Sequence, residues 1–405
     1  MRIVKDSIIY VLGEVVVKLI PFLMLPYLTR ELGPQSFGEL ANILAYVAMI
    51  SIFIGLSQEG ALARYYYRYG FRAINVVYLS CVIYSTLAAL FLYLSSFLLD
   101  LNSEIALYVI LMSFSQSLLT SQLSLKQVQK KVKDYVLIQL ICALTAVILT
   151  VLFFENFGAT HEMRLLGIVV SNAFSLAFGT YLNSHVFCSS SYLKIGVIKK
   201  TNRYIICYGI PLLVHKISFF VKGNVDKIII FSYFSAKELG VYSAAYQLSS
   251  VVMIVLASTN RALVPYYYSS LKSKKISRDE VRKWAIRSYI FVIFSATPFF
   301  FIPDWIFASL LGDGFSGVGR YVSLFTLGFL LQIPYYLAVN YFFYYAENFK
   351  LSSVTFFSSL IYMISLLYLS EISIDYVPYA LVISNLFSSV LLILLLNGNS
   401  NEVDN

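Results

Sequence analysis

Twelve apolar stretches, each close to the ~20 residues that a helix needs to cross a bilayer, take up nearly all of this chain of 405 residues. Asp, Glu, Lys and Arg make up only 13% of the residues, against roughly 25% in soluble domains. The stretches lack the period-two alternation of barrel strands, and a backbone in lipid must form its hydrogen bonds within itself. The sequence therefore predicts an all-α membrane protein with about 12 transmembrane helices. The predicted spans are residues 7–29, 37–62, 73–98, 104–125, 135–157, 163–187, 204–233, 238–268, 284–306, 321–345, 350–370 and 376–397.

An internal repeat divides the chain into halves. Ala61–Tyr67 reads ALARYYY and Ala262–Tyr268 reads ALVPYYY, at an offset of 201 residues. Ser36–Leu40 lies opposite Glu238–Tyr242 at an offset of 202. Both copies begin a span on the same side, so the repeat is parallel and predicts two pseudo-symmetric six-helix lobes, as transporters have. We expect an N-terminal lobe at 1–190, a cytoplasmic linker at 191–203, and a C-terminal lobe at 204–405 that ends in a short polar tail.

The basic residues outside the spans indicate the orientation. With the N-terminus inside, twenty of the 30 Lys and Arg residues fall at cytoplasmic ends and loops, and only Arg30, Arg164, Lys237 and Arg320 fall outside. Cytoplasmic loops are enriched in Lys and Arg, so both termini are predicted to be cytoplasmic. This topology accounts for the net charge of +9 without a nucleic-acid partner.

Nine charged residues lie three or more residues from either end of a predicted span, where charges are costly and usually functional. Six are basic and three acidic, so the excess is positive and indicates an anionic cargo in a central cationic cavity. We predict that the basic residues bind substrate and that the acidic ones couple transport to an ion. The basic set is Lys18, Lys216, Lys222, Lys227, Arg261 and Arg287, and the acidic set is Glu14, Glu59 and Asp226.

Structural interpretations remain open for several of these charges. Glu14 and Lys18 are four residues apart, acid first, which suits a helical ion pair. Asp226 equally fits a carboxylate that only neutralises Lys222 or Lys227. Arg287 lies near the cytoplasmic end of its span, where a long side chain can reach the interface.

The residues show no catalytic constellation. The three histidines and four cysteines have no metal-site spacing, and no glycine-rich phosphate loop is present. The loops predicted to lie outside are short, which disfavours a membrane glycosyltransferase or polymerase. We therefore expect no enzyme, no metal and no cofactor, and a proton or sodium gradient as the driving force.

Two stretches resemble a known family. The first runs from Gly13 to Gly38 and includes PYLTRELG at Pro26–Gly33, followed by Phe37 and Gly38. The second joins NVDK at Asn224–Lys227 to ELGVYSAA at Glu238–Ala245. Both are similar to the polysaccharide transporter family of Wzx-type O-antigen flippases, within the multidrug/oligosaccharidyl-lipid/polysaccharide exporter superfamily. The likeness in layout extends over about residues 5–397, and the chain lacks two further helices of the lipid II flippase.

The resemblance implies a function. It predicts movement of oligosaccharide repeat units on undecaprenyl pyrophosphate from the inner to the outer leaflet of the bacterial inner membrane, by alternating access. The product would serve O-antigen, as in lipopolysaccharide, or another surface polysaccharide, beside the polymerase and chain-length machinery of the pathway. A pyrophosphate suits the excess of cations, because charge-assisted hydrogen bonds to an anion are strong. An ion-coupled small-molecule exporter of the same fold is the alternative.

Overall fold

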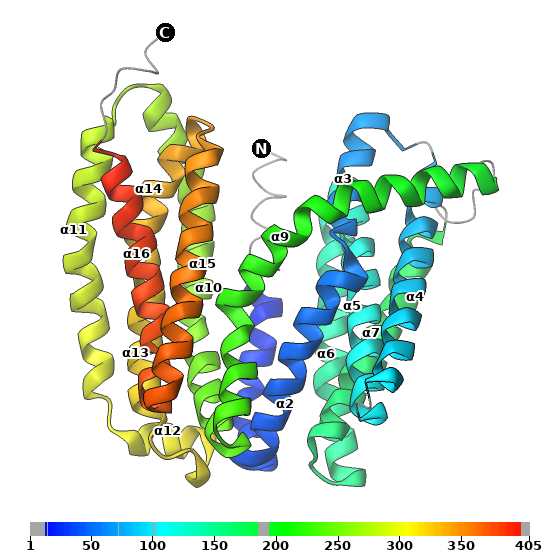
Figure 1. The fold of residues 1–405 in the computed structure, drawn as a ribbon, viewed down its shortest axis with the longest axis horizontal. Helices are drawn as coiled ribbons and strands as arrows, with labels where there is room; N and C mark the ends of the chain where they lie inside the picture. The colour runs from blue at the N-terminus through cyan, green and yellow to red at the C-terminus, as the bar shows by residue number, and fades with distance from the viewer. Residues whose placement is uncertain (1–12, 14, 72, 100–101, 185–193, 398–405) are drawn as a thin grey trace. The chain divides into compact units, whose positions relative to one another are not determined.

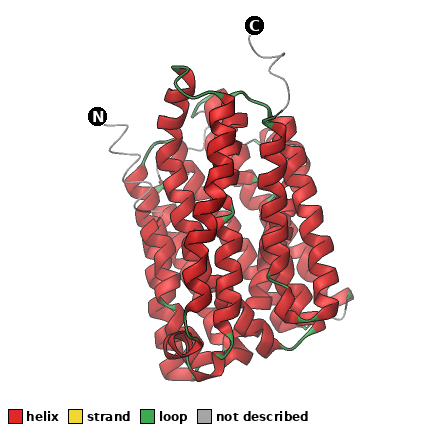
Figure 2. Ribbon diagram, turned by 90° about the vertical axis from the view of Figure 1, so that its left-hand side faces the viewer, coloured by secondary structure: helices red, strands yellow, loops and turns green. Residues whose placement is uncertain are grey.

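The computed structural model describes residues 13, 15–71, 73–99, 102–184 and 194–397. All regular secondary structure in these ranges is helical (Figures 1 and 2), which confirms the predicted all-α class. The α-helices are α2 (Leu25–Gly55), α3 (Gln58–Tyr69), α4 (Ile74–Leu98), α5 (Ser103–Val128), α6 (Val132–Phe157), α7 (His161–Leu182), α9 (Ile195–Tyr233), α10 (Ala236–Lys272), α11 (Arg278–Ala296), α12 (Asp304–Leu311), α13 (Val318–Leu330), α14 (Gln332–Tyr344), α15 (Asn348–Ile372) and α16 (Tyr379–Leu395). Three 3-10 helices join them: η1 (Thr297–Phe301), η2 (Asp313–Phe315) and η3 (Ile374–Tyr376).

Eleven helical segments in the described part are long and apolar enough to cross a membrane. They match the second to twelfth predicted spans in order. The first predicted span, 7–29, falls partly outside the described residues, although residues 15–23 are helical. The predicted linker also needs correction: α9 already begins at Ile195, so residues 195–203 are helix rather than connection. Lys and Arg are good helix formers, so the basic residues there extend the helix.

Two compact units make up the chain. Unit 1 comprises residues 1–24 and 39–220, and unit 2 comprises residues 25–38 and 221–405. The division therefore falls inside α2 and α9, not at the predicted linker. In unit 1, α5 packs against α3, α4, α6 and α7. In unit 2, α13 packs against α10, α11 and α16, and its span is the most buried of the candidates.

Helix ends follow from local chemistry. Ser235 before α10 and Ser277 before α11 each accept a hydrogen bond from the backbone N–H three residues later. The carboxylates of Glu238 and Glu280 bond back to those serines' N–H groups, which completes a capping box at each start. Such caps satisfy donors that the first turn of a helix leaves unpaired.

The predicted span 37–62 is not one helix. Leu56 and Ser57 have positive φ angles of 40° and 54°, so α2 ends before them at Gly55 and α3 begins after them at Gln58. A left-handed conformation is uncommon for residues other than glycine and tends to occur at functional sites. A second irregularity is the kink at Gly33 (φ 65°, ψ 174°), which separates the first predicted span from the second.

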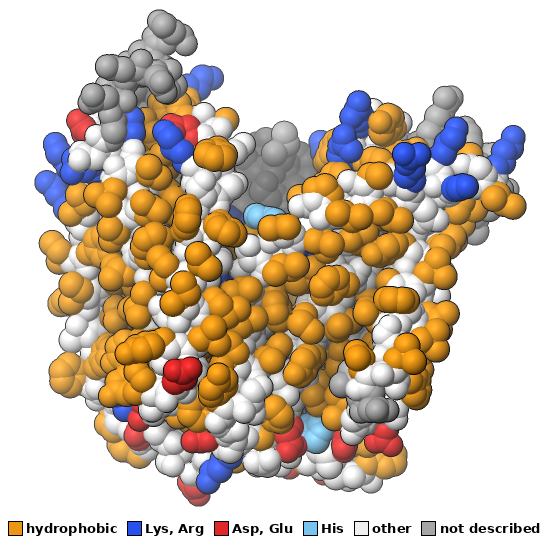
Figure 3. Space-filling model, in the orientation of Figure 1, with side chains coloured by type: hydrophobic (Ala, Val, Ile, Leu, Met, Phe, Trp, Pro, Cys, Tyr) orange, Lys and Arg blue, Asp and Glu red, His pale blue; other side chains and the backbone are white. Residues whose placement is uncertain are grey.

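Charge is segregated along the helices. On the face drawn in Figure 3, hydrophobic side chains cover the middle of the helices, with most Lys and Arg near one end and most Asp and Glu near the other. An apolar belt between charged ends is the pattern of a protein embedded in a bilayer.

Candidate functional site

A buried carboxylate forms the centre of a polar cluster in unit 2. Asp226 of α9 is 1% exposed and accepts a hydrogen bond of 2.7 Å from the Tyr242 hydroxyl of α10 at Oδ2. The Nζ atom of Lys227 lies 3.5 Å from Oδ1. The hydroxyl of Tyr362, from α15, also bonds the carboxylate. A charge this deep requires such partners, because an uncompensated buried charge is strongly destabilising.

Lys227 is fully engaged around this carboxylate. Its ammonium donates to the carbonyl oxygen of Gly223 over 2.8 Å. It also lies 4.5 Å from the centre of the Tyr246 ring, within the range of a cation–π contact. Of the two partners that the sequence left open for Asp226, the structure therefore pairs it with Lys227.

Lys222 lies one turn earlier on α9 and has a different environment. Its Nζ atom donates to Ser358 Oγ of α15 over 2.9 Å and to Asn385 Oδ1 of α16 over 3.3 Å. Both partners are neutral, so they orient the ammonium without cancelling its charge. An ammonium has three N–H donors, and these two bonds leave one for a ligand.

Asn385 and Ser358 are themselves fixed in place. Asn385 Nδ2 donates 2.9 Å to the carbonyl of Gly328, and Ser358 exchanges hydrogen bonds with Ser384. The helices α15 and α16 pack directly on each other, which holds these groups together. The Lys222 ammonium is thus held in one position by a rigid polar scaffold, as a binding group should be.

Unit 1 contains an ion pair that the sequence did not reveal. Glu59, in the first turn of α3, lies 2.5 Å from the Lys216 Nζ of α9. Both side chains are about a third exposed (33% and 37%). The sequence did not indicate this pairing, because Lys216 lies 157 positions further along the chain than Glu59. The cation predicted to bind substrate and the acid predicted to couple an ion are therefore paired.

Gln58, beside Glu59, is the centre of a hydrogen-bond network around the helix break. Its Nε2 donates to Ser85 Oγ over 2.9 Å and to the Cys81 carbonyl over 3.2 Å, and Ser121 Oγ donates to its Oε1 over 3.3 Å. Gln58 is 1% exposed. The Ile54 carbonyl, near the break, accepts from Ser85 Oγ over 3.0 Å. Gln58 was missed from the sequence; the only signal was an amide within an apolar stretch.

The remaining predicted residues are Lys18, Glu14, Arg261 and Arg287. Lys18 is exposed on the helix of residues 15–23, and Glu14 lies outside the described residues. Arg261 is exposed on α10. Arg287 is exposed on α11. That all six cations line one cavity stays a prediction.

Two basic residues at the ends of predicted spans are buried. Lys126 is 0% exposed and bonds Asp134 Oδ2 and the Leu182 carbonyl, each over 3.0 Å. Arg164 is 9% exposed and donates to Thr150 Oγ1 and, over 3.1 Å, to the Ala146 carbonyl. Their sequence positions at span ends suggested topology signals, but helix packing covers them. Both therefore connect helices within unit 1.

Comparison with known proteins gives a consistent assignment. Residues 3–271 match the family described as polysaccharide biosynthesis protein. "Lsg locus putative protein 1" of Haemophilus influenzae is 37% identical over 387 residues, covering 95% of this chain and 96% of that protein. "Putative O-antigen transporter" of Shigella dysenteriae is 25% identical, covering 93% of this chain and 94% of that protein.

A solved structure shows the same fold. It is described as the inward-facing conformation of a multidrug resistance MATE family transporter of the MOP superfamily, and it aligns with a TM-score of 0.67. The alignment covers 95% of this chain and 97% of that one, at 12% sequence identity. The chain therefore has the helical fold of this transporter, whereas the low identity carries nothing about its cargo.

Proposed function

This chain belongs to the family described as polysaccharide biosynthesis protein, and from that premise we propose that it is a flippase for lipid-linked oligosaccharides. The proposed cargo is an oligosaccharide repeat unit on undecaprenyl pyrophosphate, moved from the inner to the outer leaflet of the bacterial inner membrane. The product would feed the synthesis of O-antigen or another surface polysaccharide.

The observation that carries the proposal is the environment of Lys222. Its ammonium is held inside unit 2 by the neutral groups of Ser358 and Asn385, and the hydrogen bonds of the described residues give it no carboxylate partner. A desolvated cation with a spare donor suits a pyrophosphate, which offers several anionic oxygens. It does not suit the cationic compounds of multidrug exporters, which a positive site would repel. The polar scaffold would receive the headgroup, and the polyprenyl chain would stay in the bilayer.

We further propose that an ion gradient drives the cycle. Asp226, Glu59 and Glu14 are the acids predicted to bind the coupling ion. In unit 1, Glu59 is paired with Lys216 and partly exposed, so a proton or sodium ion could compete for it. Asp226 is enclosed by two tyrosine hydroxyls and Lys227, which makes exchange more costly.

The test measures translocation in reconstituted vesicles that contain a fluorescent undecaprenyl-pyrophosphate oligosaccharide. A charged hydrogen bond is worth about 1.5–3 kcal/mol, so Lys222→Met should slow translocation roughly 10- to 150-fold. Lys222→Arg should retain part of the activity because it keeps the charge. Lys272→Met, at the exposed end of α10, is the matched control and should translocate normally. Normal rates in Lys222→Met would refute the proposed anion site.

A further inference from the structure

Helix α11 has two contrasting faces. Its buried residues, Val281, Ala285, Val292 and Ala296, form the side that packs on α13, α14 and α16. At about 100° per residue, Arg287 projects roughly 120–180° away from all four. Arg287 therefore lies on the outward face of α11, away from the interior of unit 2.

A pair of cations lies at one end of this outward face. Lys283 and Arg287 are both exposed, four residues apart, and therefore neighbours on the helix surface. Trp284, between them, is 41% exposed. Tryptophan beside exposed lysine and arginine on an apolar helix is typical of the level of lipid headgroups. Two adjacent cations at this level form a site for a phosphate.

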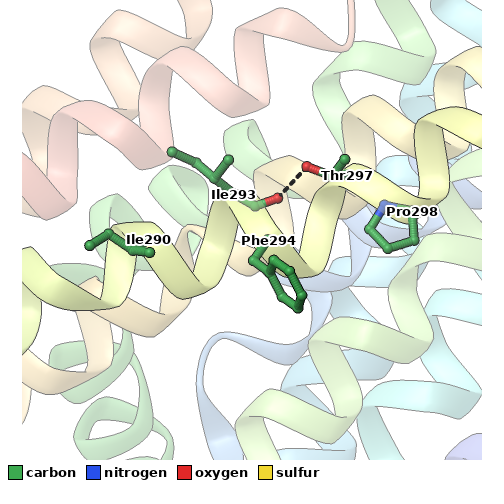
Figure 4. A pocket seen from close by; sticks show the side chains of 5 residues that line it. All are labelled: Ile290, Ile293, Phe294, Thr297 and Pro298. Carbon is green, nitrogen blue, oxygen red and sulfur yellow. Dashed lines mark hydrogen bonds between the residues drawn. The ribbon is translucent and has the colours of Figure 1, made fainter.

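An apolar groove lies further along the same helix, beyond Arg287. It is lined by Ile290, Ile293, Phe294, Thr297 and Pro298 and has a volume of about 370 Å³ (Figure 4). The Thr297 hydroxyl donates 2.7 Å to the Ile293 carbonyl, so the one polar side chain of the groove is already bonded. Helix α11 passes into η1 at Thr297, which shapes the far end of the groove.

The cations and the groove are in line. Phe294 is seven residues beyond Arg287 and Pro298 is eleven, so each of them projects within about 20° of the direction of Arg287. At 1.5 Å per residue, Phe294 lies ~10 Å and Pro298 ~16 Å further along the helix axis than Arg287. A phosphate at the cations and an apolar chain in the groove can therefore belong to one molecule.

We propose that the outward face of α11 binds one acidic phospholipid, with its phosphate between Lys283 and Arg287 and one acyl chain in the groove. A free phosphate would leave the groove unused, and a neutral lipid would gain little from two exposed cations. The exposed guanidinium of Arg287, within a candidate span, obtains an anionic partner in this way. The bound lipid covers the exposed apolar side chains of Ile290 and Phe294, which are 72% and 79% exposed.

The binding is measured by fluorescence quenching with brominated lipids. The chain has two tryptophans, Trp284 and Trp305. Replacing both by phenylalanine and introducing Phe294→Trp leaves a single tryptophan in the groove. This parent is reconstituted in phosphatidylcholine with increasing fractions of dibrominated phosphatidylglycerol, or of dibrominated phosphatidylcholine. Phosphatidylglycerol should be preferred on the order of 20-fold, because each cation near an anionic headgroup contributes roughly fivefold.

Further substitutions in this single-tryptophan protein test which cations produce the preference for phosphatidylglycerol. Lys283→Ala and Arg287→Ala should each lower the preference roughly fivefold. Lys272→Ala, an exposed cation on another helix of unit 2, should leave it unchanged. Equal quenching by the two brominated lipids in the parent, or an unchanged preference in both cation variants, would overturn the proposal. A competition experiment gives a further check, in which undecaprenyl phosphate or excess unlabelled phosphatidylglycerol is added to the brominated lipid. If undecaprenyl phosphate displaces the brominated lipid and phosphatidylglycerol does not, the occupant is a polyprenyl lipid and the proposal is overturned. Thermal unfolding confirms that each variant is folded.

Discussion

The two repeats cross at equivalent glycines, and Gly38→Ala tests that crossing. Gly38 of α2 and Gly240 of α10 differ by 202 positions, the offset of the repeat there. A Cβ atom on Gly38 would lie 2.8 Å from the carbonyl carbon of Ala236, and one on Gly240 would lie 2.8 Å from that of Pro34. Pro34 and Ala236 also differ by 202, so the two close contacts are equivalent under the repeat.

The magnitude follows from these distances. Each added Cβ lies even closer to the carbonyl oxygen than to the carbonyl carbon. Carbon atoms pack at about 3.5–4.0 Å, so α2 and α10 would have to separate by more than about 1 Å to accommodate one methyl group. The obstacle is backbone, which cannot rotate aside as a side chain does. Overpacking of this kind costs about 1–3 kcal/mol. Replacing glycine by alanine within a helix stabilises the helix by about 0.8–1 kcal/mol, which offsets part of that cost.

A matched control isolates the steric cost. Gly223, inside α9, has nothing within 4 Å of an added Cβ, so Gly223→Ala receives the helix gain alone. Thermal unfolding of the purified proteins in detergent should show a lower midpoint temperature for Gly38→Ala than for Gly223→Ala. The difference should correspond to about 1–3 kcal/mol in the free energy of unfolding. Equal midpoints would refute the crossing as described.

The partner glycine supplies a second check. Because Gly38 and Gly240 share one contact region, the first methyl group already separates the helices for the second. The Gly38→Ala/Gly240→Ala double variant should therefore lose less unfolding free energy than the sum of the losses in the two single variants. The difference should be at least about 0.5 kcal/mol. Strict additivity would mean that the two positions are independent.

Three further outcomes are expected. Glu59→Gln should weaken the response of transport to an imposed proton or sodium gradient in vesicles; an unchanged response would leave its ion pair as a structural link. Asp226→Ala removes the acceptor of a buried ammonium and two hydroxyls and should cost about 3–5 kcal/mol, read as a lower unfolding midpoint; an unaltered midpoint would contradict the buried pair. Reporters fused after Lys131 and Lys275 should read cytoplasmic and one at Asp313 external, because basic residues concentrate on one side; consistent inversion would refute the orientation.

Features set by local sequence were predictable. The spans follow from runs of apolar residues, and eleven of them recur in the described helices. The Asp226–Lys227 pair was one of the two pairings that the sequence left open, because the residues are neighbours on one helix. The glycine of each repeat was visible as a motif, and its role became clear only when the helices were seen to cross there.

Features that depend on distant packing were not predictable. The Glu59–Lys216 pair joins residues 157 positions apart, and no local spacing indicates it. Lys126 looked like a loop cation because it ends an apolar stretch, but Asp134 and the Leu182 carbonyl enclose it. The break at Leu56 was hidden as well, since its apolar neighbours read as one continuous span.

These contacts change the argument from charge. A count of intramembrane residues treats every cation as available to an anion, whereas the structure distinguishes them by their partners. Lys216 and Lys227 each face a carboxylate, and Arg287 lies on the outward face of α11. Lys222 is held by neutral oxygens alone in the hydrogen bonds that the described residues show. An anion gains most from a cation whose charge is not already balanced, so loss of Lys222 should impair transport more than loss of Lys216 or Lys227.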